Sequence, residues 1–155
     1  MKTLTFMVVA IAVPTAAWAA GPLQISSQVM VEQRTAAADG STRLTLVAPR
    51  RVVPGDRVTL VVRYRNIGAA ALGDVTLGNP VPRGMAYRAA APGTPTPELS
   101  VDGRTFGALG MLNVRAANGA LRAATLDDVT AVRWRLARPV PAGAQGELAF
   151  QAVRN

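Results

Sequence analysis

The sequence predicts an all-β protein: a single antiparallel sandwich of two sheets with about seven to nine strands. Apolar and polar residues alternate with a period of two, and turn residues interrupt this alternation about every eight to twelve positions. The 14 glycines and 11 prolines also interrupt the few segments with helix propensity. The chain has 155 residues and is 50% hydrophobic, which suits one ordinary domain and is too apolar for a disordered chain.

The first 19 residues have the layout of a secretory signal peptide. Lys2 precedes an apolar stretch at residues 4–17, and the small residues of the Ala-Trp-Ala segment at 17–19 fit a cleavage site. A transmembrane anchor is the rival interpretation, but it needs about 20 continuous apolar residues, and this shorter stretch contains Pro14. We therefore expect cleavage after residue 19, export to the periplasm or the exterior, and a mature chain without a membrane span.

The composition of the expected mature chain excludes several kinds of chemistry. The sequence has no Cys and no His, and Lys2 is its only lysine. The mature chain therefore lacks a thiol nucleophile, a disulfide, an imidazole base and the commonest metal ligands. Because Lys2 is one of the 17 basic residues, 16 arginines remain against 9 acidic residues. We expect a basic protein that uses no cofactor and is stabilised by buried apolar surface.

Residues 20–155 are expected to form one domain, which begins with a hairpin at residues 27–48. Its strands are expected at 28–34 and 42–47, joined across Asp39-Gly40, because both residues of that dipeptide accept a positive φ. The alternation already starts at Ile25, so the first strand can be longer. Such a strand can pair within its own sheet or add to the edge of another copy. The hairpin return favours pairing within the chain.

The clearest strand covers residues 57–66. It is entered through the turn signal Val53-Pro54-Gly55-Asp56 and left through Asn66-Ile67-Gly68. Successive side chains of a strand point to opposite faces, so one set should enter the core and the other should face outward. The inward set is Val58, Leu60, Val62 and Tyr64, and the outward set is Thr59, Val61, Arg63 and Arg65.

The remaining strands are expected at residues 74–78, 85–89, 98–101, 121–123, 129–137 and 147–154. Asp102-Gly103 and Asn118-Gly119 mark tight turns between strands. Alternate residues of the last two strands should point inward: Val132, Trp134, Leu136, Leu148, Phe150 and Ala152. Trp134, Phe150, Tyr64, Tyr87 and Met85 are therefore expected in the core and not on an exposed sugar-binding platform.

Several of these turns resemble the signature of a known family. The segment from Val53-Pro54-Gly55-Asp56 to Asn66-Ile67-Gly68, followed by Pro82-Arg83-Gly84-Met85, is similar to the conserved repeat of prokaryotic surface proteins known as domain-of-unknown-function family eleven. The resemblance extends over residues 44–155. It implies an immunoglobulin-like β-sandwich in an exported or cell-surface protein, with no known catalytic role.

Acidic side chains are the remaining candidates for catalysis, and they are poorly placed for it. Asp127-Asp128, Glu98 and Asp102 lie at expected turns, where capping and surface ion pairs are the usual roles. The two adjacent aspartates would point to opposite faces of a strand, which does not suit a catalytic pair. No calcium-loop spacing is present, so we expect neither an enzyme nor a metal site.

Four outward arginines are the candidate anion-binding residues: Arg63, Arg65, Arg133 and Arg135. If their strands were neighbours, the guanidinium groups would line one face and could hold phosphate or carboxylate groups of an envelope polymer. An immunoglobulin topology would instead place the two strands in different sheets, and a solvated surface is the simpler interpretation. The arginines are dispersed, so nucleic-acid binding is not expected.

These observations favour a non-enzymatic, exported structural or protein-interaction domain of the bacterial cell envelope. Its partner would be another envelope or surface protein, or a second copy bound by strand addition. The alternative is a binding module for anionic glycans or lipid headgroups, which would use the outward-facing arginines.

Overall fold

A computed structural model describes residues 21–36, 39–49 and 51–155. The expected signal peptide at residues 1–19 lies outside this part of the chain. The described residues form ten strands in antiparallel sheets and no α-helix, which confirms the prediction of an all-β, antiparallel protein. The predicted strand number of seven to nine was too low, because the three-residue strand at Asn113–Arg115 was not foreseen. No helix among these residues is long and apolar enough to cross a membrane.

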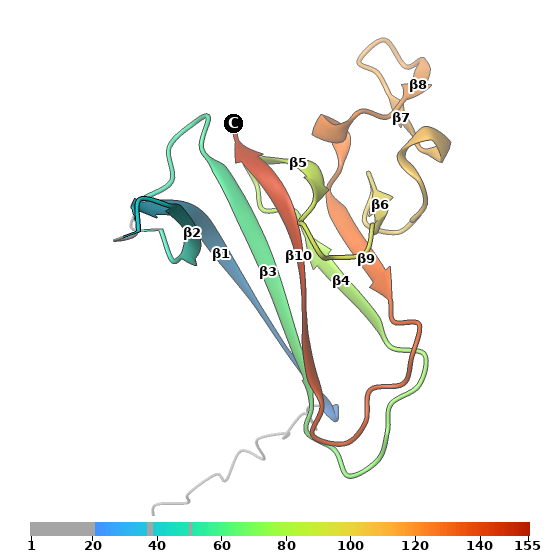
Figure 1. The fold of residues 1–155 in the computed structure, drawn as a ribbon. Helices are drawn as coiled ribbons and strands as arrows, with labels where there is room; N and C mark the ends of the chain where they lie inside the picture. Colours follow the sequence, from blue (N-terminus) through green and yellow to red (C-terminus); the bar gives the residue numbers. More distant parts are fainter. Residues whose placement is uncertain (1–20, 37–38, 50) are drawn as a thin grey trace, which may run out of the picture.

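The strands follow one another along the chain with two short 3-10 turns between them (Figure 1). They are β1 (Leu23–Ala36), β2 (Thr42–Val47), β3 (Arg57–Asn66), β4 (Thr76–Pro80), β5 (Met85–Ala90), β6 (Glu98–Ser100), β7 (Asn113–Arg115), β8 (Leu121–Ala123), β9 (Ala131–Arg135) and β10 (Gln145–Arg154). The 3-10 turns are η1 (Leu109–Met111) and η2 (Leu126–Asp128).

The chain folds as a sandwich of two unequal sheets. The larger has the strand order β2-β1-β3-β10-β5, the smaller has the order β4-β9-β6, and β7 and β8 form a separate pair. The core lies between the first two sheets, and Phe150, Leu77 and Val132 are fully buried there. Trp134 is also buried, and its Nε1 donates a 2.8 Å hydrogen bond to the carbonyl of Pro95. Of the five predicted core residues, Trp134, Tyr87 and Phe150 are buried, whereas Tyr64 and Met85 are partly buried and pack against the core.

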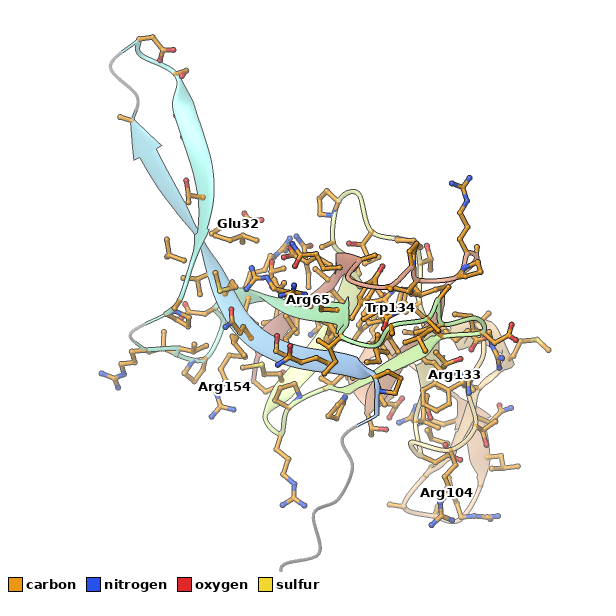
Figure 2. All side chains as sticks on the ribbon, turned by 90° about the horizontal axis from the view of Figure 1, so that it is seen from below. Glu32, Arg65, Arg104, Arg133, Trp134 and Arg154 are labelled. Atoms are coloured by element: carbon orange, nitrogen blue, oxygen red, sulfur yellow. The ribbon has the colours of Figure 1, made fainter. Side chains whose placement is uncertain are left out.

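The N-terminal hairpin forms within the chain. Residues 23–31 of β1 pair with β3, and residues 31–36 pair with β2. Asp39 stabilises the return because its Oδ1 accepts hydrogen bonds from the backbone and hydroxyl of Ser41. Since β2 pairs with β1 alone, the far half of the hairpin leaves the sandwich and projects beyond it (Figure 2).

One face of β3 differs from the prediction. Thr59 and Val61 were expected on the outside, but both are buried. The loop after β5 covers Val61, and the backbone N–H of Ala91 donates a 3.0 Å hydrogen bond to the carbonyl of Ala149. Thr59 lies between this loop and the N-terminal hairpin. Val61 packs with Ala91, Ala149 and the half-buried Met30 in a small second core. Alternation predicted which side chains share a face, but it could not predict where a loop covers that face.

The turn motifs fix the ends of β3 and the start of β5. Gly55 has a φ of +90°, and Asp56 beside it accepts a 2.8 Å hydrogen bond from the backbone N–H of Val53 through its Oδ2. Gly84 has a φ of +74°, and its carbonyl accepts a 2.9 Å hydrogen bond from Nη1 of Arg154. These motif residues therefore serve as turn and packing elements.

Candidate functional site

The four candidate arginines lie on two different sheets. Arg63 and Arg65 belong to β3 in the larger sheet, whereas Arg133 and Arg135 belong to β9 in the smaller sheet. Trp134 lies in the core between these sheets, and Figure 2 shows it between Arg65 and Arg133. The structure therefore brings the arginines together in two pairs and does not form one patch of four.

The pair on β9 is occupied by internal contacts. Both arginines share Glu98 of β6, at 2.6 Å from Nη2 of Arg133 and at 3.7 Å from Nε of Arg135. The guanidinium of Arg133 also lies 4.2 Å from the centre of the Phe106 ring. The hydrogen bond from Arg133 lowers the pKa of the Glu98 carboxyl. Much of the positive charge of this pair is therefore balanced within the domain.

The pair on β3 lies in a polar concavity on the outer face of the larger sheet. The concavity has a volume of about 490 Å³, and three adjacent strands contribute side chains to it. We call six of its residues the polar face: Gln24, Ser26, Arg63, Arg65, Gln145 and Glu147.

The strand register arranges the polar face in two rows. In the first row, Arg65 lies opposite Gln24 on one side and opposite Gln145 on the other. In the second row, Arg63 lies between Ser26 and Glu147. Each row therefore has a guanidinium at its centre and hydrogen-bonding side chains beside it, all supported by paired backbone.

The two guanidinium groups differ in how they are held. Nε of Arg63 donates a 2.9 Å hydrogen bond to Oε2 of Glu147, and Nη1 donates a 2.8 Å hydrogen bond to Oε1 of Gln28. Arg65 is exposed and has no ion-pair partner within 4.0 Å among the described residues. Arg63 is thus fixed by neighbouring strands, whereas the charge of Arg65 is available to a ligand.

A second concavity of about 320 Å³ lies further along the same face. It lies between the projecting hairpin and the loop after β5, and Glu32 and Leu46 are among the residues that line it. Glu147 lines both concavities, so the two adjoin on the outer face of the sheet.

The acidic residues considered for catalysis all make structural contacts. Asp127 pairs with Arg88 at 2.7 Å, and Asp128 pairs with Arg122 at 2.7 Å. Asp128 also accepts a hydrogen bond from the backbone N–H of Thr125, which starts η2, and these contacts lower its pKa. The described residues contain no group of three or more acidic, His or Cys side chains arranged to hold a metal ion.

Asp102 stabilises the turn after β6. Its carboxylate accepts hydrogen bonds of 2.8 Å from the backbone N–H groups of Arg104 and Thr105, and these bonds hold its pKa well below the ordinary value. Gly103 beside it has a φ of +72°, as expected for a tight turn. The chain then returns to β6 through an isolated bridge between Leu99 and Gly107.

Sequence reasoning found the arginines of the polar face but missed their neighbours. These neighbours belong to the two strands that flank β3: Gln24 and Ser26 lie on β1, and Gln145 and Glu147 lie on β10. Along the chain, β1 is close to β3 and β10 is far from it. The alternation of the sequence predicts that these side chains point outward, but the strand register decides which of them lies beside which arginine. No spacing in the sequence encodes that register.

No protein-family model, no curated protein and no solved structure matches this chain. Its function is therefore inferred from its own residues and their arrangement.

Proposed function

We propose that this chain is a non-enzymatic, exported domain of the bacterial cell envelope that binds another envelope protein by strand addition. The observation that carries the proposal is the position of β2. This strand is the last of its sheet, it pairs only with β1, and its other edge has no strand beside it among the described residues. An incoming extended segment would pair with the free N–H and C=O groups of that edge.

The sequence of β2 suits this role. Residues 42–47 contain no proline and one charged residue, Arg43, so the edge has few of the features that protect strands from pairing. Leu46 is 39% exposed and lines the second concavity, where an added strand or its flanking residues would find an apolar contact. The projection of the hairpin keeps the edge away from the rest of the domain (Figure 2).

The sandwich supplies a rigid base for the hairpin. Val29 and Val31 of β1 pack against the main core while the same strand pairs along β3. A free strand edge fixed to a stable sheet is preorganised, which lowers the entropy cost of binding.

The contacts of the acidic side chains also support an interaction role without catalysis. The acidic candidates Asp102, Asp127, Asp128 and Glu98 each bond to an arginine or to turn backbone.

The test removes the free edge and keeps the sandwich. Glu32 and Leu46 lie opposite each other in the β1–β2 register, so an Asn-Gly turn in place of residues 33–45 should close a shortened hairpin. In cells that make the protein, a photo-crosslinking amino acid at position 45 should capture a partner, with the crosslink in an extended segment. Excess wild-type chain should compete for this crosslink, and the shortened-hairpin chain should not.

A crosslinker at Leu121, which is 68% exposed on β8, provides the control. Equal competition by both chains would overturn the proposal, as would crosslinks at position 121 without any at position 45. Circular dichroism of the shortened-hairpin chain checks that the sandwich still folds.

The second candidate function is anion binding by the polar face. It is favoured by Arg65, an exposed guanidinium without an internal ion-pair partner among the described residues, next to Arg63 in a polar concavity. The ligand would be an anionic glycan or a lipid headgroup of the envelope. Retention of the purified protein on such material should then fall steeply as salt concentration rises.

A further inference from the structure

We infer that the polar face binds the carboxylated sugar units of an acidic polysaccharide, with Arg65 as the residue that holds the carboxylate. This inference rests on the second candidate function and assigns its ligand class. It concerns the outer face of β1, β3 and β10, whereas strand addition concerns the edge of β2.

The arrangement around Arg65 matches a carboxylate that is attached to a hydroxyl-bearing ring. A guanidinium binds a carboxylate through two parallel hydrogen bonds, which fixes both the position and the plane of the ligand group. Gln24 and Gln145 lie on either side of Arg65, one strand away in each direction, which is about 4.8 Å. Their amide groups donate and accept, so they can bond to sugar hydroxyls beside the carboxylate.

The second row extends the same chemistry. Ser26 and Glu147 lie on either side of Arg63, and a carboxylate such as that of Glu147 accepts hydrogen bonds from hydroxyl groups. Arg63 already donates to Glu147 and Gln28, so these side chains are held in place before a ligand arrives. The two rows together cover about 10 Å across three strands, which is wide enough for a sugar unit and its linkage.

The charge of the site favours a carboxylate over a phosphate. Arg63 is paired with Glu147, whereas Arg65 has no ion-pair partner in the part of the chain that the structure describes. The carboxylate of Glu147 lies in the row next to that of Arg65. Inorganic phosphate or a phosphate monoester, with nearly two negative charges, would be repelled by Glu147 more strongly than a singly charged carboxylate would be. A singly charged carboxylate satisfies Arg65, while the hydroxyl groups of the same sugar can donate hydrogen bonds to Glu147.

The experiment measures binding of the purified protein to tetragalacturonate, an oligosaccharide of carboxylated sugars. Its fully methyl-esterified form is the matched ligand, because it has the same rings and no negative charge. We expect titration calorimetry or NMR shift changes to show binding of the acid form only. Arg65→Gln should weaken it at least about tenfold, the effect of losing a charge-assisted bidentate contact.

Arg104→Gln is the matched control variant. Arg104 is exposed on the turn after β6, on the side of the molecule away from the projecting hairpin (Figure 2). It has the same charge as Arg65, so its loss changes the net charge equally and should leave binding within about twofold of wild type. Near-UV circular dichroism of both variants verifies that the sandwich is intact.

The outcomes separate this inference from the function on which it rests. Equal losses in the two variants, or equal binding of the methyl ester, would overturn the assignment of Arg65 and the carboxylate. Displacement of the oligosaccharide by inorganic phosphate at equal concentration would overturn the preference for a sugar acid while leaving anion binding in place. If neither tetragalacturonate nor phosphate bound, both the inference and the second candidate function would fail.

Discussion

The side-chain amide of Asn66 donates a 2.9 Å hydrogen bond to the carbonyl of Val140, 74 residues further along the chain. The same Nδ2 lies within 2.8 Å of the Ala70 carbonyl, while Oδ1 accepts a 2.9 Å hydrogen bond from the backbone N–H of Gly68. Asn66 is fully buried, so these bonds replace water completely. One side chain thus ties the end of β3 to the loop that leads from β9 to β10.

Asn66→Asp should destabilise the protein strongly. The carboxylate cannot donate to the surrounding carbonyl groups, and it places a negative charge against them in a buried site. We expect the free energy of unfolding to fall by roughly 2–4 kcal/mol in urea denaturation. Asn118→Asp is the control, because the exposed Oδ1 of Asn118 only accepts a bond from the Ala120 N–H, and Asp can do the same. A loss in Asn118→Asp as large as that in Asn66→Asp would contradict this role.

Gly146→Ala should destabilise the protein through a steric clash. A Cβ at position 146 would lie 2.3 Å from the hydroxyl oxygen of Tyr64, whose ring packs directly over the glycine. The ring is rigid and partly buried, so we expect a loss of about 1–3 kcal/mol in the free energy of unfolding. Gly73→Ala should change little, because a Cβ there meets nothing within 4 Å. Similar losses in both variants would mean that the contact with Tyr64 is unimportant.

Deletion of residues 20–33 should leave a chain that does not fold stably. β1 pairs with β3 over residues 23–31, and Leu23, Val29 and Val31 pack against the main core. Removing them exposes one side of β3 and part of the core to water. The shortened-hairpin chain keeps these contacts, so its thermal unfolding should remain cooperative. A folded, monomeric deletion product would instead show that β1 belongs to contacts between copies.

The free energy of unfolding should decrease as the pH is lowered in the acidic range. In the folded protein, hydrogen bonds lower the pKa of Asp102, Asp128 and Glu98 below their unfolded values of about 4. Because these carboxyl groups have a lower pKa in the folded state than in the unfolded state, they stabilise the protein at pH values above the unfolded-state pKa. This stabilisation is lost as the pH falls toward the folded-state pKa. Urea denaturation between pH 7 and pH 2 should therefore show decreasing midpoints below about pH 4. Asp102→Asn should make that decrease less steep, and a constant midpoint would contradict the prediction.

The sequence predicted those features that depend on local chemistry. Gly55, Gly103 and Gly119 all adopt positive φ at the predicted turns, and the phase of Val58, Leu60 and Val62 placed them in the core. The burial of Val61 was missed because it depends on packing with Ala91, in a loop that comes much later in the chain. The sequence predicted the arginines of the polar face but not their neighbours. The position of Gln24 and Gln145 beside Arg65 depends on the register between β3 and two strands from opposite ends of the chain.

Residue-resolved amide hydrogen exchange of the purified protein tests the free edge of β2 most directly. In an antiparallel edge strand, alternate N–H groups bond to the neighbouring strand and the others face solvent. We expect slow exchange throughout the central strand β3, and alternating slow and fast exchange along β2. Uniform protection of β2 would mean that its edge is already paired, and uniformly fast exchange would mean that the projecting hairpin does not form; either result would contradict the account.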